Sequence, residues 1–239
     1  MHYISIFSTI IIVAFAAAVF SRYKKRGGIH LLLWGVGLIF YGLGTFSEAI
    51  MLFTFNTSIL KIWYFSGAMM TAAWLGQGTV HLLVRKRGVA PAMTVGLGII
   101  SLLALWLLLT APVTSAAAAF DVNQPASAQY REILVRGTPL TILTILLNIY
   151  GTVALVGGAL YSSFIFWRKR VLADRMFGNI FIATGAMMPA MGGTFSRAGL
   201  PDWLYLSEFL GAILMFAGFM IATSSQRVKK DAPIPSTAK

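Results

Sequence analysis

Few ionisable side chains lie within the long apolar stretches of this sequence, and two of them occupy near-identical segments. GTFSEA spans residues 44–49 and GTFSRA spans residues 193–198, so Glu48 in the first corresponds to Arg197 in the second. An unpaired charge at the centre of a spanning helix costs about 2.5–3.5 kcal/mol on insertion scales. Pairing would remove much of that cost, and we therefore expect an ion pair between Glu48 and Arg197. The alternative is that both side chains reach the outer lipid headgroups separately.

Glu208 is a third candidate, because it lies in the outer half of the last apolar stretch. Ionisable residues inside a membrane mark functional sites by default. With Arg197, Lys61 and Asp202 at a similar depth, Glu208 predicts an outward-facing polar cluster. This cluster could bind a ligand, or it could be a fully paired network that only fixes helix register. Glu48 and Glu208 could also form a carboxylate pair, although no other pattern supports hydrolysis.

A second polar group lies deeper and toward the inner side: Gln77, His81, Asn148 and Asn179. Amides between helices usually bond a neighbour, contributing about 0.6 kcal/mol on average, so we interpret this inner cluster as packing. His30 and His81 lie near the same edge, and two facing histidines can bind a haem. Both sit beside basic clusters and there is no second pair at the other depth. We therefore expect no haem.

The motifs of common hydrolases are missing from the sequence. It has no HExxH, no GxSxG, and no Ser-His-Asp set or aspartate pair within the apolar stretches. With no cysteine, disulfides and thiolate metal ligands are excluded. We therefore expect no catalytic activity, no metal site and no cofactor.

Composition indicates an integral membrane protein. Of 239 residues, 58% are hydrophobic and only 11% are charged, and the mean hydropathy is +0.79. A soluble domain would carry roughly a quarter charged residues. The net charge of +12 comes from short basic clusters between apolar runs, and so indicates membrane topology rather than a nucleic-acid partner.

We expect an all-α fold, a bundle of seven transmembrane helices. A spanning helix needs about 20 mostly apolar residues. Seven runs approach or exceed this length: residues 3–20, 29–54, 62–84, 90–110, 140–167, 176–195 and 203–223. The bundle is expected over residues 1–226, with a short disordered cytoplasmic tail over 227–239. Pro189 is expected to kink the sixth helix.

Orientation follows from lysine and arginine, which gather after the first, third and fifth runs and in the tail. The positive-inside rule then places the N-terminus outside and the C-terminus in the cytoplasm. The basic residues follow the first run rather than precede it, so we expect a retained helix and not a signal peptide. The longest loop, residues 111–136, would lie outside. Its alanine, serine and proline content predicts a mobile loop with a short amphipathic turn near residues 130–135.

The chain also carries the marks of an internal repeat. FSGAMM at residues 65–70 follows the first GTFS segment, and FLGAIL at residues 209–214 follows the second. Spans one to three therefore resemble spans five to seven, with span four as connector. Such a three-plus-one-plus-three repeat is parallel, with its axis along the membrane normal. Glycines along the second span, Gly35 and Gly42 with Gly37 and Gly44, would allow close helix approach.

One long segment, LLLWGVGLIFYGLGTFSEAIMLFTFNTSILKIWYFSGAMMTAAWLGQGTVHLLVRKR (residues 31–87), resembles two helices of a known family. It is similar to spans two and three of the seven-helix sensor module at the N-terminus of many bacterial histidine kinases. The shared features are an early Trp, a Tyr-Gly and a Glu near the outer end, and a Trp-Tyr opening the next helix. The resemblance implies a sensing or interaction bundle in a bacterial plasma membrane. The family carries a cytoplasmic kinase domain that the short tail does not supply, so we expect output through a separate protein partner.

The expected function is a non-enzymatic, receptor-like module that binds a small or lipid-like ligand in an outward-facing cleft. The alternatives are an accessory subunit of a larger membrane complex and a small repeat-based transporter. Retinal is excluded because the last span has no lysine for a Schiff base.

Overall fold

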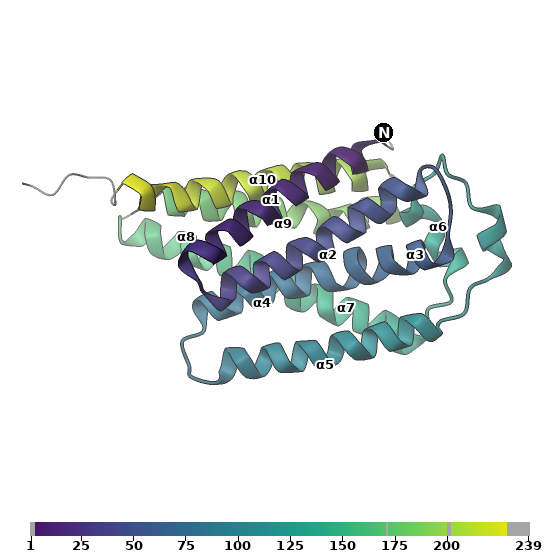
Figure 1. Ribbon diagram of the computed structural model, residues 1–239, viewed down its shortest axis with the longest axis horizontal. Helices are drawn as coiled ribbons and strands as arrows, with labels where there is room; N and C mark the ends of the chain where they lie inside the picture. Colours follow the sequence, from purple (N-terminus) through teal and green to yellow (C-terminus); the bar gives the residue numbers. More distant parts are fainter. Residues whose placement is uncertain (1–2, 171, 200–201, 229–239) are drawn as a thin grey trace, which may run out of the picture.

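Long helices lying side by side make up the computed structural model (Figure 1), which describes residues 3–170, 172–199 and 202–228, without the side chains of 193–197, 202 and 225–228. Within this part of the chain, five helical segments are long and apolar enough to cross a membrane. They are α1 (Ile4–Arg26), α2 (Ile29–Met51), α5 (Val89–Thr110), the stretch Thr138–Arg168, and α10 (Asp202–Val228). The expected all-α, multi-pass membrane architecture is confirmed at this level.

Two of the long helical segments contain a π-helical turn. The first runs without interruption through α3 (Thr57–Trp63), the π-helix η1 (Tyr64–Met70) and α4 (Thr71–Leu83). The second runs through α7 (Thr138–Thr152), the π-helix η3 (Val153–Gly157) and α8 (Gly158–Arg168).

The remaining long helix, α9 (Ala173–Arg197), has 25 residues and contains Pro189. Each of the seven apolar runs expected from the sequence therefore coincides with a helical segment.

The contacts between these segments close a ring of six. α2 packs against α1 and against α3–η1–α4, and α4 packs against α7 and η3. α8 packs against α9, α9 against α10, and α10 against α1, which completes the ring. α5 is left at the edge of the bundle, where it touches α4 and α7 (Figure 1). Six helical segments thus surround a common interior.

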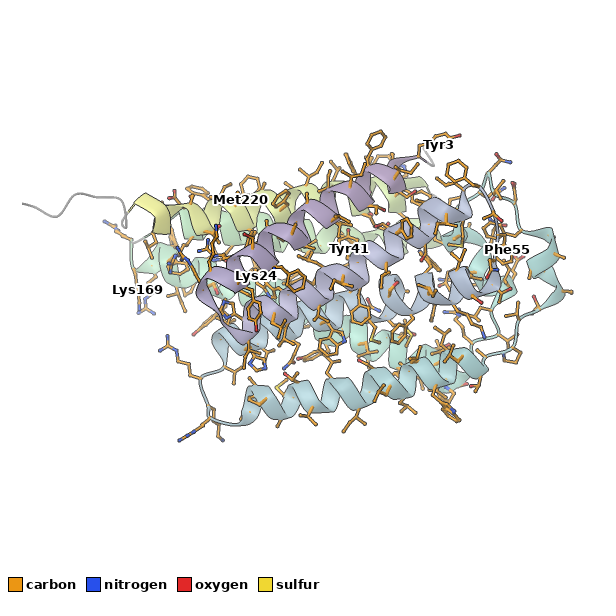
Figure 2. All side chains as sticks on the ribbon, viewed as in Figure 1. Tyr3, Lys24, Tyr41, Phe55, Lys169 and Met220 are labelled. Atoms are coloured by element: carbon orange, nitrogen blue, oxygen red, sulfur yellow. The ribbon has the colours of Figure 1, made fainter. Side chains whose placement is uncertain are left out.

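The two ends of the bundle differ in charge. The C-terminal end of α1, the loop between α4 and α5, and the loop between α8 and α9 lie at one end (Figure 1). Lys24 and Lys169 are found at this end, whereas Tyr3 and Phe55 lie at the other (Figure 2). Each of these three connections contains a basic cluster. We call this the basic end of the bundle.

The connection between α5 and α7, expected to be a mobile loop with a short amphipathic turn, contains helical turns and packs on the bundle, and its mobility stays a prediction. It contains a short 3₁₀-helix, η2 (Ser115–Ala119), and a helix, α6 (Ala126–Ile133), which lie at the end opposite the basic end (Figure 1). Val113 and Leu134 form an isolated β-bridge, and the rings of Phe55 and Phe120 stack with centroids 4.3 Å apart. Ile133 and Leu134 are almost fully buried, and this burial fixes the segment on the bundle.

Several glycines let helices approach closely. A Cβ atom added to Gly44 would lie 2.9 Å from the Cα of Gly67, so α2 and η1 meet backbone to backbone. A Cβ at Gly151 would overlap the backbone of Ala72. On α2, a Cβ at Gly35 would collide with the ring of Phe20 from α1. The predicted role of the α2 glycines in close packing is confirmed, because small residues at these positions bring the segments of the ring together.

Candidate functional site

A cavity of about 620 Å³ lies inside the ring of helices. Its wall is formed by α2, η1, α4, α7, η3, α9 and α10, and residues of α6 line it at the end opposite the basic end. The wall is mostly apolar, with a few polar side chains among its lining residues: Tyr41, Thr45, Thr71, Thr144, Asn148 and Glu208. A concave, largely apolar cavity with a few convergent polar groups is the usual form of a small-molecule site.

Glu208 of α10 lines this cavity, and Glu48 of α2 lies beside Glu208 without being one of the lining residues. Glu48 is 1% exposed, and its Oε1 accepts a hydrogen bond of 2.7 Å from Trp63 Nε1. The side chain of Glu208 lines the cavity and lies close enough to Glu48 to interact with it. Within ordinary hydrogen-bond distances, however, Oε2 of Glu48 has no partner. The sequence proposed both glutamates as site residues, and the structure brings them together.

The other charged residues predicted beside the glutamates, Arg197, Lys61 and Asp202, are not shown to join them. The side chains of Arg197 and Asp202 lie outside the described part of the chain, so the expected ion pair with Glu48 stays a prediction. Lys61 is directed elsewhere, because its Nζ donates to the carbonyl oxygens of Leu109 and Ala111, each at 2.9 Å. It satisfies carbonyl groups at the C-terminal end of α5, where helix carbonyls lack partners within the helix.

Four hydroxyl groups of the cavity wall donate to backbone carbonyls. Tyr41 donates to Glu208 O at 2.8 Å, Thr71 to Ser66 O at 2.8 Å, and Thr144 to Leu140 O at 2.8 Å. Thr45 likewise donates within α2, to the carbonyls of Gly42 and Tyr41.

The amide of Asn148 follows the same pattern. Its Nδ2 donates to Ala68 O at 2.7 Å and to Thr144 O at 2.9 Å. The hydrogens of these five wall residues are therefore already in use, and the wall offers mainly acceptor atoms to the interior.

Aromatic rings connect α6 to the rest of the site. The ring of Tyr130 packs edge-on against Trp63, with centroids 5.3 Å apart, and lies tilted against Tyr64, with centroids 5.6 Å apart. The guanidinium of Arg136 lies 4.9 Å from the Tyr130 ring centroid, and its Nη1 donates to the Tyr64 hydroxyl at 3.4 Å. A cation over an aromatic face at this distance is attractive. Burial has the largest single effect and lowers the pKa of the Arg136 guanidinium, but the hydrogen bond to Tyr64 and the electrostatic effects of Tyr130 and Tyr64 together outweigh it, so the pKa lies above its usual value.

These aromatic residues were missed as site residues from the sequence. Trp63 and Tyr64 are 6% and 1% exposed, and Trp63 lines the cavity. Trp203 and Trp167, which also lie near the ends of apolar runs, are 48% and 64% exposed. The signal that separates the two sets is a nearby carboxylate, because Trp63 uses its N–H to bind Glu48.

Both π-helical turns border the cavity. Gly67 and Ala68 of η1 and Val153 and Leu155 of η3 are among its lining residues. A π-helical turn is rare and occurs frequently at functional sites. The carbonyl of Ala68 accepts from Asn148 on α7, so a backbone group of the first π turn is bonded across to the facing helix.

The inner polar cluster predicted from the sequence forms in part. Gln77 Nε2 donates to Ala90 O at 3.0 Å and to Thr94 Oγ1 at 2.8 Å, and its Oε1 accepts from the hydroxyl of Tyr150. His81 Nε2 lies 2.7 Å from the same Thr94 oxygen. These bonds fasten α4 to α5 and α7, as expected of interhelical amides.

Asn179 is not tied to this cluster by any described hydrogen bond, because its Nδ2 donates to Arg175 O of its own helix at 2.8 Å. His30 lies near enough to His81 for the two imidazoles to interact electrostatically. Among the described residues, no three His, Asp or Glu side chains gather as a metal ion would require.

Comparisons of the chain with models of protein families, with curated proteins and with solved structures returned no match.

Proposed function

We propose that this multi-pass membrane protein is a receptor-like module that binds a small, largely apolar or lipid-like molecule in its central cavity. The observation that carries the proposal is the cavity itself: about 620 Å³, lined by helices from both halves of the chain, with a few polar side chains such as Glu208 and Asn148 in a mainly apolar wall. A cavity of this size and lining is suited to a small organic ligand. No catalytic role is assigned to the wall residues.

The edge of the cavity formed by α7 and η3 supports a ligand that dissolves in lipid. Three of the lining residues, Ile145, Ile149 and Val153, are 49%, 56% and 66% exposed. They belong to a stretch apolar enough to cross the membrane. The cavity is therefore open along a side that faces hydrocarbon, and an amphiphilic molecule would enter from within the bilayer.

The proposal includes seven crossings with the N-terminus outside. The five candidate spans are joined by α3–η1–α4 and α9, which lie among them in the ring. The basic end would face the cytoplasm, as the positive-inside rule requires. α6 would then lie over the cavity on the outer side, as expected for a sensor of the plasma membrane that resembles the histidine-kinase module.

A parallel repeat of three spans fits the contacts of the ring. A two-fold axis along the membrane normal would exchange span one with five, two with six and three with seven. It would then map the contact of α1 with α10 onto the contact of α7–η3–α8 with α4, and both contacts occur. The cavity would lie between the two triplets of spans.

The test is to identify what occupies the cavity. The full chain is purified from its native membrane into lipid nanodiscs, and bound small molecules are detected by native mass spectrometry. Ala186 lines the cavity, and we expect Ala186→Phe to fill part of it and to displace the bound molecule. The matched control is Ala92→Phe on the exposed face of α5, which should retain the same molecule at the same occupancy.

Equal occupancy in Ala186→Phe and in the wild type would refute the proposal. A protein that co-purifies in fixed stoichiometry, with no small molecule bound, would instead favour an accessory subunit of a larger complex. Ligand movement into sealed vesicles would favour a transporter.

A further inference from the structure

Among the described residues, few hydrogen-bond donors reach the glutamate pair beside the cavity. Each ionised carboxylate can accept several hydrogen bonds. The single described donor to Glu48 is Trp63 Nε1, and Oε2 of Glu48 is buried without a partner. A buried polar atom left without a partner needs an explanation, and an absent ligand is one of the established explanations.

Three polar residues of the described wall, Tyr41, Thr45 and Asn148, do not supply a further donor to the pair. Tyr41 and Thr45 lie on α2 at the same cavity as Glu208, but both hydroxyls donate to backbone carbonyls. The amide hydrogens of Asn148 are also bonded to carbonyls. The part of the cavity around Glu208 therefore presents mainly acceptor atoms, and its complement is a group rich in donors.

The end of the cavity near α6 has the opposite character. Arg131 and Ser127 line it there, and the Nε of Arg131 donates to the Tyr130 hydroxyl at 3.3 Å. The cavity wall therefore carries a basic side chain on α6, Arg131, and an acidic one on α10, Glu208. A ligand that carries a cation would place it at the glutamates.

We propose that Glu48 and Glu208 bind the protonated amine of an amphiphilic ligand, whose apolar part fills the rest of the cavity. This assignment rests on the proposed ligand-binding function and adds the chemical class of the ligand. An alkylammonium group carries a positive charge and supplies three N–H donors, which is what the glutamate pair lacks. The indole of Trp63, held beside Glu48 by its hydrogen bond, adds an aromatic surface that favours a cation.

The test uses three probes with one skeleton and different charge: 4-phenylbutylamine, 4-phenylbutan-1-ol and 4-phenylbutyrate. Each is titrated by calorimetry into the full chain in nanodiscs, with empty nanodiscs subtracted for partition into lipid. A charge-assisted hydrogen bond contributes about 1.5–3 kcal/mol. We therefore expect the amine to bind roughly 10- to 100-fold more tightly than the alcohol, and the carboxylate to bind most weakly.

Glu208→Gln should lower the affinity for the amine to that for the alcohol and leave the alcohol unchanged. The matched control is Glu132→Gln, because Glu132 is an exposed carboxylate on α6 that does not line the cavity, and it should behave as the wild type. The comparison of probes on the wild type needs no variant, so the inference can be tested even if Glu208→Gln does not fold.

Two results would overturn the amine assignment and leave the proposed function standing: equal binding of alcohol and amine that Ala186→Phe abolishes, or preferential binding of the carboxylate, which would place the charged group at Arg131. Saturable binding of none of the three probes would also overturn it. Failure of the proposed function is separately recognised by the native-membrane experiment, in which Ala186→Phe would not change the bound molecule.

Discussion

Glu48 is a fully buried acid whose described hydrogen bond comes from one indole N–H, that of Trp63. The two residues lie on adjacent segments, α2 and α3, which are joined by a short connection. This bond therefore does two things: it satisfies one carboxylate oxygen and it fixes the Trp63 ring at the edge of the cavity. Tyr130 then packs on that ring, so the position of α6 depends on the same bond.

Trp63→Phe should reduce the free energy of unfolding by about 1–3 kcal/mol, because it leaves a buried acceptor without its donor. The measurement is unfolding in detergent micelles by steric trapping. The control is the same change in a Glu48→Leu background, where the acceptor is gone and the loss should be much smaller. An equal loss in both backgrounds would mean that Trp63 acts through packing alone.

Single residues could be proposed from the sequence, but not their pairing. Glu48 and Glu208 are conspicuous because charged residues are rare in apolar stretches. Which of them face each other depends on the rotation of each helix about its axis. Lys61 illustrates this point: it has the same depth as the glutamates but caps the carbonyls of α5.

At the scale of elements, the glycines decide how closely the segments of the ring approach. Gly151 at the end of α7 meets the backbone of Ala72 in α4, and this contact lies beside η3 and beside the cavity. Helices that approach this closely have room for no side chain at the crossing. The shape of the cavity therefore depends on the crossing of α4 and α7.

Gly151→Ala should destabilise the protein by about 1–3 kcal/mol, because the added methyl group must displace backbone rather than a flexible side chain. Gly96→Ala in α5 is the matched control, since nothing lies within 4 Å of the added Cβ. The control should be neutral or stabilising by up to about 1 kcal/mol, as expected for replacing glycine in a helix. Thermal unfolding of both variants checks the prediction, and equal melting temperatures would contradict it.

Helix positions followed from the sequence because a run of about 20 apolar residues is itself the physical requirement for a span. The π turns η1 and η3 could not be predicted in this way. An apolar run has the same composition whether its backbone hydrogen bonds follow the α or the π pattern. Which pattern forms depends on packing against neighbouring helices. The packing of α6 could not be predicted for a similar reason, because it depends on Trp63 and Tyr64, which are far away in sequence.

At the scale of the whole molecule, the two ends of the bundle differ both in charge and in the elements that cover them. The basic end gathers three clusters that are far apart in sequence, and α6 covers the opposite end (Figure 1). A distribution of this kind is what the positive-inside rule produces in a membrane protein with an odd number of spans. The gathering of the basic clusters at one end could therefore be predicted from the sequence alone, whereas the ring and its cavity required the contacts between helices. The orientation in the membrane stays a prediction.

The natural absence of cysteine makes this orientation directly testable. Ser115→Cys in η2 and Lys86→Cys in the loop between α4 and α5 each introduce one exposed thiol at opposite ends. In intact cells, a membrane-impermeant maleimide should label the thiol at position 115 and should reach the thiol at position 86 only after permeabilisation. The reverse pattern would contradict the proposed topology.

The open edge beside Ile145, Ile149 and Val153 also determines which ligand concentration governs binding. A molecule that arrives from the hydrocarbon is sampled at its mole fraction in lipid, not at its concentration in the buffer. Apparent potency would then rise with the oil–water partition coefficient of the compound and fall when more membrane is added at a fixed total dose. Two compounds with identical fit could thus differ widely in effect simply because one dissolves better in fatty chains.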